Sequence, residues 1–279
     1  MATFIEVLKV LVFGIVEGFT EWLPISSTGH MILLDEIIPM NVSTEFKDMF
    51  MVVIQLGAIL AVVVLYFHKL NPFSPRKSEK QRKATLRLWT KILVACLPAA
   101  VIGLLIDDWM EAHLMNSYVV AAMLIIYGIL FIVIERYNEG QKPIVEKTGS
   151  ITYRLALCIG FFQVLALVPG TSRSGATILG AILLGCSRGV AAEFSFFLGI
   201  PVMFGASLLK ILKFGLGNFK GMEVFYLVFG MVVAFLISVY SIKFLLSYIR
   251  KNDFTVFGFY RIALGVVVLL YFGISKLLG

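Results

Sequence analysis

Residues 16–30 read VEGFTEWLPISSTGH and place two carboxylates, four hydroxyl groups and a histidine inside a very apolar part of the chain. The apolar segments on either side, about 4–22 and 31–39, are too short or too interrupted to match the roughly 20 apolar residues of a membrane-crossing helix. A polar link at 23–30 joins them. Irregular backbone at membrane depth must be enclosed by protein or water, so this pattern predicts a re-entrant helix pair that enters and leaves on one side.

The composition places the whole chain in the membrane class. Of 279 residues, 59% are hydrophobic and 15% are charged, and the mean hydropathy is +0.95. Soluble domains average about 45–50% apolar and about 25% charged residues. The net charge of +7 is therefore interpreted as loop charge near anionic lipid of the bilayer, and we expect no nucleic-acid partner.

A second interrupted pair occupies the other half of the chain. Its apolar segments, about 153–168 and 176–186, flank the link VPGTSRSGA at 168–176. Six further apolar runs are long enough to span a bilayer. These predicted spans are roughly 49–67, 88–106, 118–135, 190–209, 223–243 and 257–278. The sequence thus predicts an all-α polytopic membrane protein with six transmembrane helices and two re-entrant helix pairs.

The two halves are related by a shift of 146 residues. Under this shift the matched positions are Gly14 with Gly160, Glu17 with Gln163, Ser26 with Ser172, Thr28 with Ser174, and Gly29 with Gly175. Each half contains one helix pair and then three spans, and an odd number of spans inverts the next copy. We therefore expect an inverted-topology repeat, about 1–140 and 150–279, within one integral membrane domain, 1–279. Such a repeat places a binding site near the midplane.

Lysine and arginine predict the orientation, because they concentrate in cytoplasmic loops. Residues 68–91 carry eight of them. Following the chain through the spans assigns seventeen to that side, Arg261 included, and six to the other. The segment 107–117 has three acids and no lysine or arginine, so it should face outward. We expect both termini outside and the first link open to the outer face.

Two intramembrane acids indicate a functional site. Glu17 and Glu21 are four residues apart, so on a helix they share one face and repel each other. Either one is protonated or a cation lies between them, and oxygen ligands favour Mg²⁺ or Ca²⁺. The alternative is that both acids point into a watery vestibule.

Both links also suit an anion. Small and hydroxylated residues precede an apolar run in each, and helix N-termini offer free N–H groups and partial positive charge. The candidate phosphate-binding residues are Ser26, Ser27, Thr28 and Gly29 in the first link, with Ser172, Arg173, Ser174, Gly175 and Thr177 in the second. Plain N-capping is the alternative explanation, and it is compatible with phosphate binding.

Arg173 strengthens the anion hypothesis, because the planar guanidinium matches phosphate. The alternative is a structural ion pair with Glu17 or Glu21, since buried arginines are normally paired. His30 follows Ser27 by three residues. A serine hydroxyl needs a base to become a nucleophile, and histidine is the usual one. The alternative is that His30 is only a hydrogen-bonded polar group.

Together these groups predict a metal-assisted phosphoryl-transfer site within a membrane. The candidate catalytic residues are Glu17, Glu21, Ser27, His30 and Arg173, and the candidate metal ligands are Glu17 and Glu21. The rival hypothesis is a transporter or flippase for a polyprenyl phosphate or another anion, because inverted repeats with broken helices are typical of secondary transporters.

EGFTEWLPISSTGH at 17–30 and PGTSRSGAT at 169–177 closely resemble the two signature motifs of the undecaprenyl-diphosphate phosphatase family, the bacterial bacitracin-resistance type. The resemblance covers essentially the whole chain, with no departure at a motif position. It implies six spanning helices and two re-entrant pairs in inverted repeats. The residues that match the motifs are Glu17, Glu21, Ser27, His30, Ser172, Arg173, Ser174 and Thr177.

The resemblance also implies an activity. The enzyme would remove the terminal phosphate of undecaprenyl diphosphate and so recycle undecaprenyl phosphate, the lipid carrier of peptidoglycan synthesis, for cell wall biogenesis. It would need a divalent cation, lie in the bacterial cytoplasmic membrane, open to the outer face and confer bacitracin tolerance. A covalent phosphoserine and direct water attack both stay open, as does a homodimer.

Overall fold

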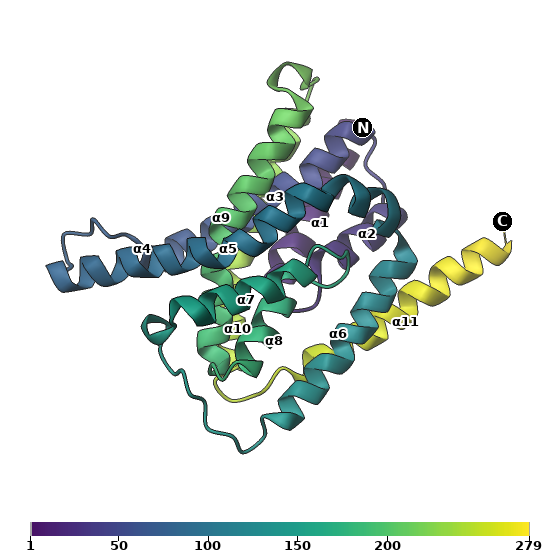
Figure 1. Cartoon of the computed structure of the whole chain (residues 1–279). Helices are drawn as coiled ribbons and strands as arrows, with labels where there is room; N and C mark the ends of the chain where they lie inside the picture. The colour runs from purple at the N-terminus through teal and green to yellow at the C-terminus, as the bar shows by residue number, and fades with distance from the viewer. Residues whose placement is uncertain (1, 279) are drawn as a thin grey trace.

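The computed structural model describes residues 2–278, and these form helices joined by links (Figure 1). Within that range there is no β-strand, only an isolated bridge between Val145 and Cys186. The side chains of residues 2, 3, 107, 108, 111 and 275–278 lie outside the description. Among them are the three acids of segment 107–117, which is predicted to face outward. Lys276, one of the six basic residues assigned to the outer side, is also among them.

Six long helices correspond to the predicted spans. They are α3 (Thr44–Leu65), α5 (Glu79–Leu114), α6 (Ser117–Tyr137), α9 (Arg188–Phe214), α10 (Glu223–Tyr248) and α11 (Thr255–Leu278). Within the described residues, each is long and apolar enough to cross a membrane. The prediction of an all-α chain with six candidate spanning helices is confirmed. The predicted span 49–67 passes the end of α3, because the chain turns at Tyr66 before the short helix α4 (Phe67–Leu70).

Four shorter helices form the two interrupted pairs. They are α1 (Ala2–Thr20) with α2 (Ser27–Ile37), and α7 (Tyr153–Leu165) with α8 (Arg173–Leu183). Both α2 and α8 begin earlier than predicted, because Ser26 and Ser172 cap them through their side chains. The second half of each polar link is therefore the first turn of a helix. Two 3-10 turns, Thr148–Ser150 and Leu216–Asn218, complete the helical elements of the described range.

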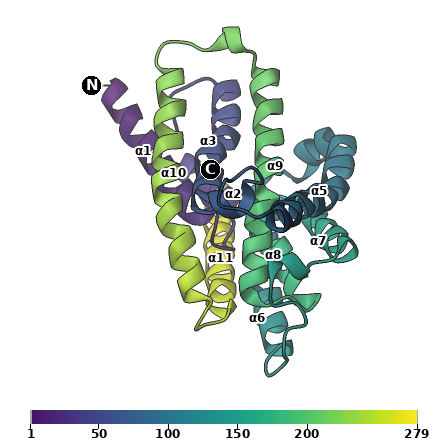
Figure 2. The ribbon, with the colours of Figure 1, turned by 90° about the vertical axis from the view of Figure 1, so that its left-hand side faces the viewer.

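Helix α3 lies between two other long helices. It packs against α9 and α10, while α1 lies along α10, α7 lies along α5, and α6 pairs with α11. Figure 2 shows α9 and α10 as two long ribbons joined at one end, with α3 between them, α1 beside α10, and α5 and α7 beyond α9. This arrangement brings the links that follow α1 and α7 toward each other.

Glycine permits the closest helix crossings. A Cβ on Gly57 of α3 would lie 2.0 Å from the Met231 carbonyl oxygen of α10. Gly128 of α6 and Gly258 of α11 face each other, and a Cβ on either would lie 2.7 Å from the other's carbonyl oxygen. Small residues at helix interfaces allow backbones to approach in membrane proteins, where packing rather than water exclusion drives association.

The repeat prediction gains support from paired local geometry. Ser26 and Ser172 both have a φ of 73°, and within the described residues they are the only non-glycine residues with positive φ. Gly14 and Gly160 both lie at tight crossings, where an added Cβ would approach a neighbouring helix's carbonyl oxygen within 2.9 and 2.3 Å. The inverted orientation and the re-entrant course of the short helices stay predictions.

Gly57→Ala should lower the stability of the helix core, because a Cβ there displaces the α10 backbone. Overpacking of this kind costs about 1–3 kcal/mol. Gly205→Ala in α9 is the matched control, since nothing lies within 4 Å of its added Cβ. Thermal unfolding of the purified variants in detergent should show a lower midpoint for Gly57→Ala alone. Equal midpoints for the two variants would contradict the described crossing.

Candidate functional site

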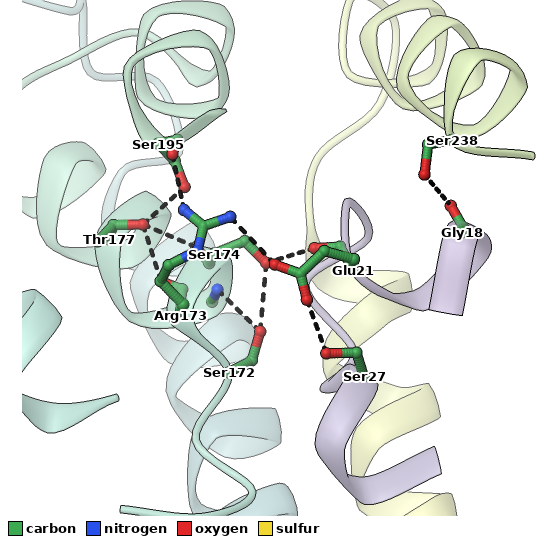
Figure 3. Close-up of polar contacts among 10 residues, drawn as sticks. Gly18, Glu21, Ser27, Ser172, Arg173, Ser174, Thr177, Ser195 and Ser238 are labelled. Carbon is green, nitrogen blue, oxygen red and sulfur yellow. Dashed lines mark hydrogen bonds and ion pairs between the residues drawn. The ribbon is translucent and has the colours of Figure 1, made fainter. Parts of the chain in front are cut away.

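The two polar links meet at Glu21, which is buried (Figure 3). Its Oε2 accepts a hydrogen bond of 2.7 Å from the Ser27 hydroxyl at the start of α2. Its Oε1 accepts one of 3.1 Å from Nη2 of Arg173 at the start of α8. The Ser174 hydroxyl donates to the Glu21 backbone carbonyl over 3.2 Å. One residue therefore contacts both helix starts, and the two halves of the chain share a single polar cluster.

Helix α9 holds Arg173 from the other side. Nη1 of Arg173 donates to the Ser195 carbonyl over 2.7 Å. A Cβ on Gly199 would lie 2.8 Å from Nη2 of Arg173, so only glycine leaves room for the guanidinium there. The Thr177 and Ser195 hydroxyls are 2.7 Å apart and support the same region. The structural ion pair considered for Arg173 is thus present, with Glu21 as its partner and not Glu17.

Each helix start is capped by a strained serine. The Ser26 Oγ accepts from the Gly29 amide over 3.3 Å, and the Ser172 Oγ accepts from the Gly175 amide over 3.2 Å. A φ of 73° in a non-glycine residue costs roughly 1–3 kcal/mol and persists only where the surroundings impose it. The capping alternative is therefore observed at both serines.

The predicted phosphate-binding residues are all placed at these two helix starts. Ser27, Thr28 and Gly29 form the first turn of α2 after the Ser26 cap, and Arg173, Ser174, Gly175 and Thr177 follow the Ser172 cap in α8. All but Thr28 are buried or half-buried. Two helix N-termini with hydroxyl groups, close to one guanidinium, form a surface suited to bind an anion.

His30 is hydrogen-bonded away from Ser27. Its Nδ1 lies 2.7 Å from the Ser26 carbonyl, which can only accept, so Nδ1 carries the proton. Its Nε2 is then the acceptor and lies 2.7 Å from the Tyr260 hydroxyl of α11, and the two rings are nearly parallel at 5°. Within the described residues Ser27 pairs with Glu21, and the Ser27–His30 hydrogen bond that we expected is not formed.

Glu17 is fully buried, and neither of its carboxylate oxygens has a hydrogen-bond partner among the described residues. A buried, unpartnered carboxylate must take up a proton or a cation. Glu21 follows one turn later, where its amide donates to the Glu17 carbonyl over 3.0 Å. Carboxylate oxygens are the ligands that hard cations prefer, and in the described range those of Glu17 have no protein partner, whereas those of Glu21 bind Ser27 and Arg173. The described residues contain no group of three or more histidine, cysteine or acidic side chains that could enclose a metal alone.

Three residues near the site were missed by the sequence interpretation. Ser195 and Tyr260 lie inside the predicted spans 190–209 and 257–278 and carry no signal of their own in the sequence. Arg261 is counted in the sequence analysis with the charges of the cytoplasmic side, but its side chain is fully buried in α11 and is therefore not a loop charge. The available signal was its place inside the predicted span 257–278, since an intramembrane charge indicates a functional site by default.

Glu21→Gln should destabilise the protein by about 3 kcal/mol, because it leaves the Arg173 guanidinium buried without a carboxylate. Glu79→Gln is the matched control. Its partner Lys83 lies in an exposed ion pair, and such pairs contribute at most about 1 kcal/mol. Unfolding free energies in detergent measure the difference. A loss for Glu21→Gln no greater than that of the control would show that the buried pair contributes nothing.

Comparison with known proteins identifies the family. The family model of bacitracin resistance protein BacA matches residues 10–267. An undecaprenyl-diphosphatase of Enterococcus faecalis is 61% identical over 270 residues, covering 96% of this chain and 98% of that protein. One of Desulfitobacterium hafniense is 61% identical over 276 residues, 99% of each chain, and one of Limosilactobacillus fermentum is 57% identical over 272 residues, 97% and 99%. Together with the six apolar helices, these matches make the chain a multi-pass membrane protein. The chain belongs to the bacitracin resistance protein BacA family.

Proposed function

We propose that this protein hydrolyses undecaprenyl diphosphate to undecaprenyl phosphate and inorganic phosphate. The main observation in support is the hydrogen bonding of Glu21. One of its carboxylate oxygens accepts from the Ser27 hydroxyl, and the other accepts from the Arg173 guanidinium. A hydroxyl with its proton acceptor, next to a group that binds phosphate, is the minimum for phosphoryl transfer. The relatives named undecaprenyl-diphosphatase support the same substrate.

In the proposed reaction the Ser27 hydroxyl attacks the terminal phosphorus. The bond between that phosphorus and the bridging oxygen breaks, and the lipid phosphate leaves. The proton of Ser27 passes to Oε2 of Glu21, which already accepts its hydrogen bond over 2.7 Å. Water then cleaves the bond between phosphorus and the serine oxygen, which releases inorganic phosphate, and Glu21 returns its proton to that oxygen and so restores the hydroxyl. Each step conserves atoms and needs no further reactant.

Arg173 and the two helix starts bind the phosphate in this proposal. A phosphate oxygen competes with Oε1 of Glu21 for the guanidinium, because charge-assisted bonds from arginine to phosphate are strong and geometrically matched. The free amides of α2 and α8 add donors toward the same charge. His30 is left for the second step. Its unprotonated Nε2 accepts from the Tyr260 hydroxyl, so a proton of the attacking water would reach Nε2 through that hydroxyl.

A lipid substrate explains why this chemistry lies in an apolar chain. Only the diphosphate head group must meet the polar cluster, while the prenyl tail stays in hydrocarbon between helices. Bacitracin sequesters the diphosphate lipid, so the same reaction would give tolerance to the antibiotic and return the carrier to peptidoglycan synthesis.

Phosphate release from a polyprenyl diphosphate by the purified protein in detergent tests the function. Detergent micelles enclose no compartment, so transport cannot produce the signal. Ser27→Ala should lower kcat by about 10²-fold or more, because the nucleophile is lost. Ser207→Ala is the control, a buried serine that bonds only to the Val52 carbonyl of α3. No phosphate release by the wild-type protein would overturn the proposal, and turnover by Ser27→Ala near the wild-type rate would replace the serine route with direct water attack.

We further propose that Glu17 and Glu21 hold a divalent cation, Mg²⁺ or Ca²⁺. Both carboxylates are buried, and Glu17 has no other partner among the described residues. When bound, the cation would neutralise charge on the phosphate oxygens. Hard cations are often held by one or two carboxylates together with substrate phosphates, which matches the two acids available.

Removal of divalent cations with EDTA should therefore abolish phosphate release, and Mg²⁺ or Ca²⁺ should restore it. Glu17→Gln should raise the concentration of cation needed for half-maximal activity, because one ligand loses its charge. The control is Asp35→Asn, because Asp35 forms an ion pair with Lys47 that is more exposed than Glu17. This variant should need the same concentration of cation as the wild-type protein. Full turnover in excess EDTA would contradict the cation proposal while leaving the hydrolase proposal intact.

We also propose that the site opens to the outer face of the bacterial cytoplasmic membrane, with both termini outside. The bias of lysine and arginine toward residues 68–91 supports this orientation.

Single cysteines report the orientation directly. In a background without Cys96, Cys158 and Cys186, Met115→Cys should react with an impermeant thiol reagent on intact spheroplasts. Lys80→Cys should react only after lysis. Both positions are exposed, so burial does not explain a difference. The opposite labelling pattern would invert the orientation and place the site on the cytoplasmic face.

A further inference from the structure

Arg261 of α11 is a fully buried guanidinium that binds backbone carbonyls instead of an acid. Within the described residues it has no carboxylate partner, and its Nε has no hydrogen-bond partner. Its Nη1 and Nη2 donate to the carbonyls of Pro24 at 3.2 Å, Gly170 at 2.8 Å, Thr171 at 2.9 Å and Met123 at 3.4 Å. The Tyr127 ring covers it, with 5.6 Å between the ring centroid and Cζ. Four carbonyls from three segments therefore converge on one side chain.

The carbonyls are placed next to the two strained caps. Pro24 lies two residues before Ser26, and Gly170 and Thr171 lie directly before Ser172. Both serines have a φ of 73°, which the surroundings must impose. Arg261 is the one residue that the described hydrogen bonds connect to both links just before these caps. It is also close to the first turn of α8, because a Cβ on Gly175 would lie 3.3 Å from its Nη1.

We propose that Arg261 is a positioning residue for the phosphate site: it fixes the spacing and direction of the α2 and α8 N-termini by holding both links to α11. This inference rests on the proposed hydrolase function. Arginine suits the task because its rigid planar fork reaches carbonyls in several directions, whereas lysine has one flexible ammonium group. Arg261 itself makes no contact with Ser27, Glu21 or Arg173 among the described bonds.

A positioning role makes a specific kinetic prediction. Misplaced donors no longer match the transition state, so kcat falls while substrate binding changes little. A residue that only stabilises the fold would lower the folded fraction and leave the kcat of folded molecules unchanged. A residue that binds substrate through its charge would raise KM at constant kcat when the charge is removed.

The test uses full-length Arg261→Lys and Arg261→Gln, purified in detergent and normalised to the folded fraction by size exclusion. Lysine keeps the charge without the fork, and glutamine keeps donors without the charge. We expect both to lower kcat about 10²-fold with KM within about threefold of wild type. Arg188→Lys is the control, since Arg188 forms its own partly buried ion pair with Glu135 and contacts neither link. It should keep the wild-type kcat.

The outcomes separate the two proposals. A wild-type protein that releases no phosphate refutes the hydrolase proposal itself. An active wild type with unchanged kcat in both folded Arg261 variants overturns only the positioning role, and a raised KM for Arg261→Gln at constant kcat replaces it with substrate binding. If neither variant folds, Tyr127→Leu, which removes only the ring over the guanidinium, must lower kcat at constant KM for the inference to stand.

Discussion

The ion pair between Glu21 and Arg173 is the constraint on which the rest of the structure depends. Burying a carboxylate or a guanidinium without a partner costs several kcal/mol, and the contact between Glu21 and Arg173 offsets part of that cost for both groups. They come from opposite halves of the chain, 152 residues apart. Their contact requires the link after α1 to face the start of α8, while α1 packs against α10 and α7 packs against α5. The same contact leaves Oε2 of Glu21 free to accept from Ser27, so the interaction that joins the halves also builds the chemical site.

Several independent contacts determine the geometry of the site. Two serines are held at an unfavourable φ, a fully buried arginine binds the carbonyls before them, and Gly199 admits the Arg173 guanidinium against α9. Donors that are fixed before the substrate arrives need no reorganisation when charge develops on the phosphate, and this preorganisation is the largest source of catalysis in many enzymes. The strain at the caps is consistent with such a role, since strained backbone concentrates at functional sites.

The sequence predicts much of this architecture because its signals are local. Apolar run length located the six candidate spanning helices, and motif chemistry placed Glu21, Ser27 and Arg173 among the functional candidates. Contacts between segments far apart in the chain leave no such signal. The choice of Glu21 over Glu17 for Arg173, and of Glu21 over His30 for Ser27, depends on how α1, α8 and α11 pack. The apolar runs predict the helix starts too late, because the first turn of each helix is polar. Residue patterns suggest capping by the link serines but not their positive φ. Arg261 was misassigned because it lies near the end of its span, where loop charges are common.

The central claim is that Glu21 couples Ser27 and Arg173 into one catalytic unit. A double-mutant cycle on kcat/KM for phosphate release, with Ser27→Ala and Arg173→Lys singly and together, measures that coupling most directly. The account predicts strong non-additivity, in which the double variant is no slower than the slower single variant. A parallel cycle of Ser27→Ala with Ser207→Ala should be additive, because Ser207 bonds outside the site. Additive losses in the first cycle, with a coupling energy as small as that of the second cycle, would contradict the account.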